Sequence, residues 1–193
     1  MSSREDILAR LRKNTRTTFP KPEVQIQGIQ YANPLEQFIH IATTAGGAKL
    51  IELKSGDDLN DKIHEVYPEA KVISSNVPGV KADRNPDEVA EAQDLDGTDV
   101  GVIQGEIGVA ENACIWIPQT MKEKAVMFIS EQLVILLPKR QIVNNMHEAY
   151  QRIAFNDYGF GTFISGPSKT ADIEQSLVYG AQAARGVTIF LTE

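Results

Sequence analysis

The sequence predicts an α/β protein of three layers, in which a mostly parallel β-sheet is flanked by helices. Short apolar runs alternate with amphipathic stretches along most of the chain, as in the repeated strand and helix units of a parallel sheet. Glycine and proline separate these runs, and both residues end regular elements. With 193 residues, of which 42% are hydrophobic, the chain is long enough for one sizeable core rather than two.

The N-terminal region, residues 1–30, is predicted to form a helix and an extended arm. Ser3 and Asp6 have the spacing of a capping box, and the apolar residues after them recur on one face of a helix. Two prolines near residue 20 cannot continue that helix. We therefore expect a first helix that is mobile or docks on a partner, an extended arm after it, and a single domain over residues 31–193.

Within this domain the first helix is predicted to start at Pro34, which follows Asn33 at a first-turn position, and to end at Gly46-Gly47. Strands are then expected at 49–53, 71–74, 132–137, 161–165 and 187–192, with helices at 57–67, from about Pro86, at 140–154 and at 171–180. This order predicts strands that run parallel, because each helix can carry the chain back across the sheet.

A β-rich insertion is expected near residues 99–118. Gly101, Gly105 and Gly108 are spaced among β-branched residues, which indicates bulges or close approach of the backbone to other groups. Two strands joined through residues 110–113 fit this pattern best.

Composition restricts the class of partner and the compartment. The formal charge is −7, and no stretch gathers Lys and Arg into a stripe, so we expect no nucleic-acid partner. The single cysteine, Cys114, excludes an intrachain disulfide. No apolar run is long enough to span a bilayer and the N-terminus is charged, so we expect a cytoplasmic protein without membrane contact.

The segment 163–174 is predicted to run from a strand through a polar loop into the start of a helix. Such a loop offers hydroxyls, free helical N–H groups and a lysine, which suit an anionic ligand. The candidate ligand-binding residues of this loop are Ser165, Gly166, Ser168, Lys169, Thr170 and Asp172. The alternative is that Ser168 or Thr170 only caps the helix and Gly166-Pro167 only makes the turn. Pro167 occupies the lysine position of a Walker loop, which disfavours nucleoside triphosphates.

Two glutamates lie in the segment 105–114. Glu106 and Glu111 are five residues apart, so in strands they point to opposite faces, and we favour Glu111 as a general base or nucleophile. Cys114 is interpreted as a small core residue. The three histidines lack metal-ligand spacing, and we predict no bound metal.

The C-terminal part resembles the signature of the lactate-utilisation (LUD) family. The matching residues run Ser165-Gly166-Pro167-Ser168-Lys169-Thr170-Ala171-Asp172-Ile173-Glu174, followed by Leu177-Val178-Tyr179-Gly180. Upstream, Gly108-Val109-Ala110-Glu111 before a strand resembles the family's Ala-Glu-Thr-Gly-Thr segment, and residues 133–138 resemble its next apolar strand. Residues 4–8 fit the family's opening helix, whereas residues 20–95 match weakly.

This resemblance implies a fold like that of the superfamily of glucosamine-phosphate deaminase, ribose-phosphate isomerase and CoA transferase. It also implies a role in oxidising L-lactate to pyruvate, beside partner subunits that carry iron–sulfur clusters. One cysteine cannot hold such a cluster, so we expect none in this chain and leave its cofactor and oligomeric state open.

Two departures from the family pattern bear on activity. The chain has Asn112-Ala113-Cys114 where the family has Thr-Gly-Thr, and Gln182-Ala183-Ala184 where it commonly has a His-Gly-Pro step. Three hypotheses follow. The first is an accessory subunit of a lactate-oxidising complex, with a small anion or cofactor at the loop and at Asn112, and with Glu111 across the cleft. The second is a stand-alone sugar-phosphate or acyl-transfer enzyme, and the third is a non-catalytic binding or scaffold protein.

Overall fold

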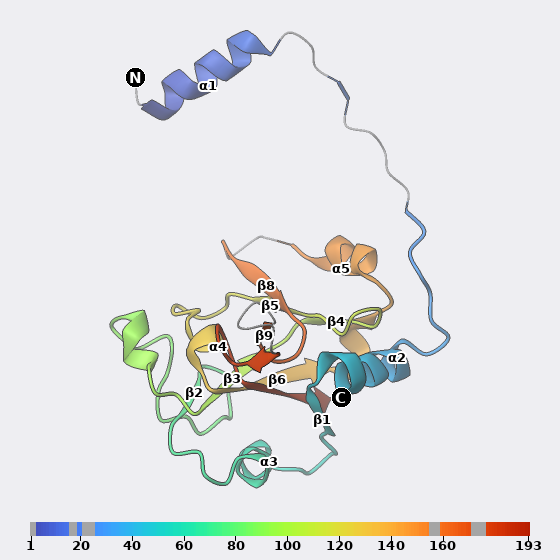
Figure 1. The fold of residues 1–193 in the computed structure, drawn as a ribbon, viewed down its shortest axis with the longest axis vertical. Coiled ribbons are helices and arrows are strands. Elements are labelled where there is room, and N and C mark those ends of the chain that lie inside the picture. Colours follow the sequence, from blue (N-terminus) through green and yellow to red (C-terminus); the bar gives the residue numbers. More distant parts are fainter. Residues whose placement is uncertain (1–2, 16–18, 21–25, 155–158, 171–176) are drawn as a thin grey trace.

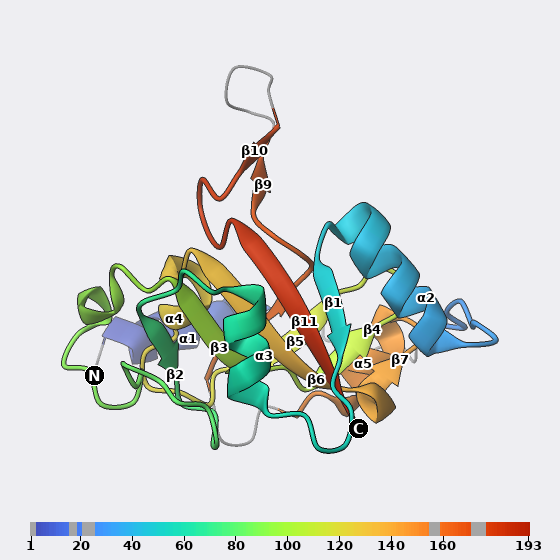
Figure 2. The ribbon, with the colours of Figure 1, turned by 90° about the horizontal axis from the view of Figure 1, so that it is seen from below.

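A parallel sheet forms the centre of the molecule. The computed structural model describes residues 3–15, 19–20, 26–154, 159–170 and 177–193. Among these residues, five strands pair in the order β1-β11-β6-β3-β2, all parallel; Figure 1 shows the whole fold, and all five strands can be followed in Figure 2. Their bounds are β1 Lys49–Glu52, β2 Ile73–Ser75, β3 Val100–Gln104, β6 Gln132–Pro138 and β11 Gly186–Thr192. The predicted α/β class, with a mostly parallel sheet flanked by helices, is confirmed.

The two faces of this sheet bury different partners. Val134 and Leu136 of β6, with Phe190 of β11, pack toward helix α3 (Leu59–Val66). Their neighbours along β6 point the other way, because side chains alternate across a strand, and they join a larger cluster with Phe38 of helix α2 (Pro34–Ile41). Full burial of a side chain such as Phe190 stabilises the fold by roughly 1.5–3 kcal/mol.

A second sheet covers the α2 face of the first. Its order in the described residues is β7-β4-β5-β8, with bounds β4 Ile107–Val109, β5 Ile115–Pro118, β7 Ile142–Val143 and β8 Gly161–Ile164. Helix α5 (Met146–Arg152) packs on the outer side of this sheet, where Ala149 meets Trp116 and Val109 in one cluster. The predicted β-rich insertion therefore contributes one strand, β3, to the parallel sheet and a hairpin, β4–β5, to the second sheet.

The helix predicted from Pro34 is confirmed as α2 (Pro34–Ile41), which continues through one π-helical turn, Ala42–Gly46. The Asn33 side chain accepts the Glu36 N–H at 3.3 Å, and Gly47 ends the helix with a φ of 73°. Proline at the first turn and glycine after the last are the usual signals for these two ends.

Residues 86–95 do not form the predicted helix. They form turns and a 3-10 segment, Ala92–Leu95. The Asn85 side chain accepts the Asp87 N–H at 2.9 Å, and the Asp94 carboxylate accepts the N–H groups of Ala90 and Glu91. Short polar side chains that bind nearby N–H groups compete with helix formation, which explains the difference.

The helix predicted over 140–154 is shorter than expected. Helix α5 begins only at Met146, because Lys139–Gln141 form a 3-10 turn and β7 then pairs with β4. The Asn145 side chain caps α5 by accepting the Glu148 N–H at 3.1 Å. A short helix that the pattern did not predict, α4 (Val126–Ile129), lies beside the parallel sheet and buries Val126 and Met127.

The helix predicted over 171–180 is wrong where the chain is described. Val178–Tyr179 form a strand, β10, that pairs antiparallel with β9 (Lys169–Thr170), and residues 171–176 lie outside the described residues. Figure 2 shows this hairpin projecting from the body of the molecule.

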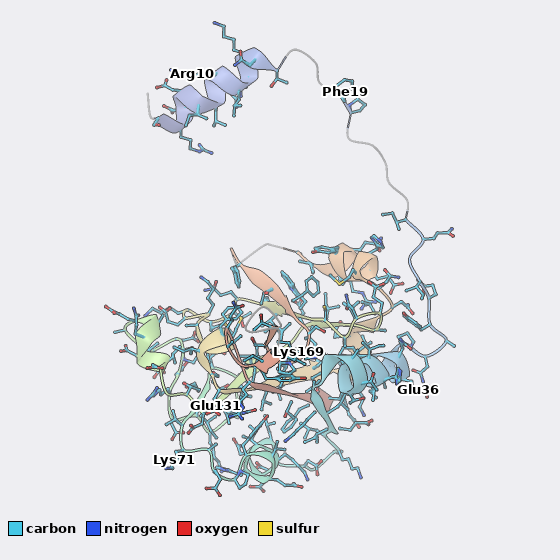
Figure 3. All side chains as sticks on the ribbon, viewed as in Figure 1. Arg10, Phe19, Glu36, Lys71, Glu131 and Lys169 are labelled. Carbon is cyan, nitrogen blue, oxygen red and sulfur yellow. The ribbon has the colours of Figure 1, made fainter. Side chains whose placement is uncertain are left out.

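The N-terminal helix is confirmed as α1 (Ser3–Asn14), and none of its twelve residues is buried. It stands apart from the sheets, with Arg10 on the helix and Phe19 on the arm both away from the core (Figures 1 and 3). The arm contacts the domain again near Tyr31, whose N–H donates to the Asn144 side chain at 2.9 Å. Across the described residues, no helix has the length and apolar character needed to cross a membrane.

Candidate functional site: the signature loop and the pocket beside it

Glu111 follows β4 and is tied to the start of α5. Its carboxylate oxygen Oε1 accepts the N–H of Met146, the first residue of that helix, at 2.8 Å. Its own N–H donates to the Asn144 carbonyl at 3.1 Å. An acidic group at this position satisfies a free helical N–H and favours the positive end of the helix dipole. The observed contacts of Glu111 thus fix the position of α5.

Asn112 lies in the turn between β4 and β5, and Ser165, just after β8, contacts it. The Asn112 side chain accepts the Cys114 N–H at 3.1 Å, and the Ser165 hydroxyl donates to the Asn112 carbonyl at 2.8 Å. The bond from the Cys114 N–H to the Asn112 side chain spans Ala113, which has a φ of 53°. A residue with a side chain rarely adopts such a φ.

Cys114 is half-buried beside this turn and packs against the cluster around Trp116. Burial raises the pKa of the Cys114 thiol, and the nearby Glu111 charge raises it further, while a hydrogen bond with Ser165 acts in the opposite direction. The thiol is therefore protonated at neutral pH and is a poor nucleophile.

The signature loop follows the carboxyl end of β8, as predicted, but its described part leads into the strand β9. Ser168 donates its N–H to the Ala184 carbonyl at 2.9 Å and accepts the Gly180 N–H at 3.0 Å. The helical N–H groups predicted to bind an anion would come from residues 171–174, which lie outside the described residues, so that part of the prediction stays a prediction. The alternative that Ser168 or Thr170 caps a helix depends on the same residues and also stays a prediction.

The loop is bonded to the end of the π-helical turn that continues helix α2. Lys169 extends toward this end, where its Nζ donates to the carbonyls of Ala45 and Gly46 at 2.9 and 2.6 Å (Figure 3). The last carbonyls of a helix lack partners within the helix, and a lysine is a common cap for them. Gly166, with a φ of 70°, passes so close to Gly46 that a Cβ would overlap the Gly46 carbonyl oxygen.

A pocket of about 340 Å³ lies beside this loop. It is bounded by α4, β8, the loop, the segment before β11, and the first residues of β6 and β11. Its lining residues are Met127, Phe128, Leu133, Thr162, Phe163, Ile164, Gly166, Ser168, Lys169, Gln182, Ala183, Ala184 and Val187. Because Leu133 and Val187 are the second residues of their strands, the pocket lies at the amino-terminal edge of the parallel sheet.

The predicted site residues fall into two groups. Gly166, Ser168 and Lys169 line the pocket. Glu111 and Asn112 in the β4–β5 turn, and Ser165, which bonds to that turn from the start of the loop, lie outside the described lining. Thr170 is half-buried in β9, and Asp172 lies outside the described residues.

Sequence reasoning missed several lining residues, which are Thr162 on β8, the α4 residues and the start of β11. From the sequence alone, residues 182–184 were noted only as a departure from the family pattern. In the structure, Gln182, Ala183 and Ala184 all line the pocket. Their place in a family motif close to the signature was the signal that could have found them.

In the described ranges, no group of three or more His, Cys, Asp or Glu side chains is placed to hold a metal ion. Positive charge at the pocket is supplied by Lys169, while its other polar lining groups are neutral.

Comparison with known families identifies the relationship. The family model of the LUD domain matches residues 87–192, which is more than half of the chain and includes the β4–β5 turn, the signature loop and all of the residues that line the pocket. The chain belongs to the LUD domain family. LUD relatives include a lactate utilization protein C of Exiguobacterium, which is 25% identical over 99% of this chain and 96% of its own length.

Two further relatives extend this comparison. A lactate utilization protein C of Shouchella clausii is 31% identical over 53% of this chain and 48% of its own length. An uncharacterized protein of Neisseria meningitidis is 24% identical over 98% of this chain and 93% of its own.

Among solved structures, a DUF162 family protein from Deinococcus radiodurans superposes with a TM-score of 0.65. At 15% identity it covers 86% of this LUD chain and 100% of its own. The likeness supports the fold. The wider superfamily that the sequence resemblance implied stays a prediction.

Proposed function

We propose that this LUD protein takes part in lactate utilisation, as a subunit that binds a small carboxylate such as lactate or pyruvate. The observation that carries the proposal is the pocket of about 340 Å³ lined by Gly166, Ser168 and Lys169 of the family's signature loop. The names of the Exiguobacterium and Shouchella relatives supply the metabolic context.

The polar side of the pocket suits a carboxylate. Two N–H groups of the Lys169 ammonium are donated to the Ala45 and Gly46 carbonyls. An ammonium has three N–H groups, so the third and the positive charge remain for an anion. The Ser168 hydroxyl and the Gln182 amide line the same pocket and add neutral donors.

The rest of the pocket lining is mostly apolar. Leu133 and Val187 from the sheet and Met127 from α4 would receive the methyl group of lactate. At about 30 Å³ per water, the pocket has room for roughly eleven water molecules, whereas lactate has only six non-hydrogen atoms. A second molecule therefore has space to approach a bound substrate.

Oxidation of L-lactate to pyruvate releases two electrons and two protons, so it needs an electron acceptor. We assign that role to iron–sulfur partner subunits rather than to this chain. The exposed helix α1 supports this division of labour, because 56% of Ile7 and 59% of Leu11 are accessible. Its basic residues Arg10, Arg12 and Lys13 would help it to contact an acidic partner.

Ligand binding can be tested by thermal unfolding of the purified protein against lactate, pyruvate, acetate and chloride at constant ionic strength. We expect lactate or pyruvate to raise the melting temperature, since a ligand at one hundred times its Kd stabilises by about 2.7 kcal/mol. Ser168→Ala should reduce the shift. Ser165→Ala is the matched control, because its hydroxyl bonds to Asn112 outside the described pocket lining. Equal shifts in both variants, or none in the wild type, would contradict the site.

The metabolic role can be tested in the source organism by deleting the gene and measuring growth on L-lactate as the carbon source. We expect growth to fail and to recover with the wild-type gene. The Ser168→Ala gene should restore growth less well than the Ser165→Ala gene. Unimpaired growth of the deletion strain, with normal lactate consumption, would reject a role in lactate utilisation whatever the purified protein binds.

A further inference from the structure

A second, smaller cavity lies on the other side of the signature loop. Its volume is about 130 Å³, and Pro167 of the loop is part of its wall, whereas Gly166, Ser168 and Lys169 line the larger pocket. The remaining lining residues are Gly47, Lys49, Tyr67, Gln132, Tyr179, Arg185, Gly186, Val187 and Thr188. These residues come from the starts of β1, β6 and β11, from the end of α3, and from β10.

The charge at this cavity is opposite to that of the whole protein. The chain has a formal net charge of −7, yet Lys49 and Arg185 line the cavity and none of its described lining residues is acidic. The Lys169 ammonium lies close behind, since a Cβ on Gly47 would be 3.3 Å from its Nζ. The end of α3 carries about half a negative charge, which is less than the two positive side chains supply.

Neither Lys49 nor Arg185 makes a short charge-assisted hydrogen bond to a carboxylate among the described residues. The Arg185 Nη1 lies 3.7 Å from the Glu131 carboxylate, beyond the range of about 2.7–2.9 Å for a charge-assisted hydrogen bond, and its side chain is 70% exposed. The Lys49 Nζ lies over the Tyr67 ring, 5.9 Å from the centroid. Both groups can therefore turn toward an anion without breaking a strong bond.

Hydroxyls complete the polar wall. The Tyr67 and Thr188 oxygens are 2.7 Å apart, and Thr188 is buried. One of the two protons forms the bond between these hydroxyls, so the other is left to donate elsewhere. Burial raises the pKa of Tyr67, and the bond with Thr188 only partly offsets this, so the phenol stays protonated as a donor. Gln132 also lines the cavity.

We propose that the cavity between Lys49, Tyr67 and Arg185 binds a phosphate group, either as inorganic phosphate or at the end of a small phosphorylated metabolite. Its volume equals about four water molecules at roughly 30 Å³ each, which suits the four oxygens of a tetrahedral anion. Donors from separate elements surround such an anion better than they would a planar carboxylate. This site does not depend on the role proposed for the larger pocket.

The test is calorimetric titration of the whole protein with inorganic phosphate at constant ionic strength. We expect the double variant Lys49→Gln and Arg185→Gln to bind at least about tenfold more weakly than wild type. The matched control is Lys54→Gln with Arg140→Gln, which removes the same charge near the carboxyl ends of β1 and β6. Tyr67→Phe, which keeps the ring, should weaken binding by a smaller factor.

Further arms identify the source of the phosphate and separate the two pockets. Tighter binding of glycerol phosphate than of inorganic phosphate would indicate a metabolite, and the reverse would indicate the free ion. Ser168→Ala should leave phosphate affinity unchanged. The proposal is overturned if wild type shows no binding, if both double variants weaken it equally, or if Ser168→Ala abolishes it.

Discussion

Gly166 illustrates how one missing side chain positions the signature loop. Its left-handed φ of 70° and its approach to the Gly46 carbonyl place the loop against the end of the α2 segment, where Lys169 can reach two carbonyls. The sequence predicted a turn at this position, but the contact between Gly166 and Gly46 joins residues 120 positions apart and has no local signal.

We expect Gly166→Ala to lower the free energy of unfolding by more than about 2 kcal/mol, because it adds a backbone overlap to the cost of a left-handed φ. Gly79→Ala is the matched control. Gly79 has a φ of 87°, and no other atom lies within 4 Å of the place that a Cβ would take, so only the conformational cost of about 1–2 kcal/mol remains. Urea denaturation measures both, and equal losses would contradict the overlap.

Glu111 was predicted to act as a general base or nucleophile, whereas its observed contact is a hydrogen bond to the first residue of α5. Because its carboxylate accepts the Met146 N–H, Glu111→Ala should cost about 1 kcal/mol of stability, as loss of a helix cap does. Glu111→Gln keeps an acceptor oxygen and should cost less, and exposed Glu106→Ala serves as a control. If Glu111 were a general base, Glu111→Gln would abolish turnover while leaving stability nearly intact.

The elements that sequence patterns predicted well are those with strong local signals. The first-turn proline at Pro34 and the apolar alternation of residues 132–137 located α2 and β6. The failures involve long-range pairing, as where β7 pairs with β4, or polar side chains such as Asn85 that bind the backbone. Three of the predicted signature residues, Gly166, Ser168 and Lys169, line the pocket. The lining residues that α4 and β11 bring to it carry no local pattern in the sequence.

Helix α5 also anchors the arm, through a charged residue. Burial raises the pKa of Glu148, but hydrogen bonds donated by Gln30 and Asn144 outweigh this and hold the pKa below its usual value. A lowered folded-state pKa gives stability that is present above the unfolded-state value of about 4.3 and is lost as the pH falls through the folded-state value.

We therefore expect the arm near Gln30 and Tyr31 to detach from α5 in acid before the domain unfolds. Hydrogen exchange of the Tyr31 amide between pH 3 and pH 7 measures this directly, because that N–H is bonded to Asn144. In Glu148→Gln the exchange rate, corrected for its intrinsic pH dependence, should vary less with pH. An unchanged acid profile in that variant would show that another group controls the arm.

The molecule as a whole consists of a packed α/β body and a helix that contributes nothing to its core. No residue of α1 is buried, so deletion of residues 2–15 should leave the melting temperature within about 1 °C of wild type. Deletion through residue 31 should lower it measurably, because it also removes the contacts to Asn144, Asn145 and Glu148. Thermal unfolding monitored by circular dichroism distinguishes the two, and a large loss in the first variant would mean that α1 stabilises the body.

The position of β11 has a consequence for how the protein is made. This strand lies between β1 and β6 inside the sheet, although it follows every other strand of that sheet in the sequence. During translation, β1 therefore has no neighbour to pair with until residues 186–192 have left the ribosome. From the synthesis of β6 until that of β11, the nascent chain exposes an unpaired apolar edge of β6. We therefore expect chaperones that recognise unpaired strands to bind the nascent chain during this time.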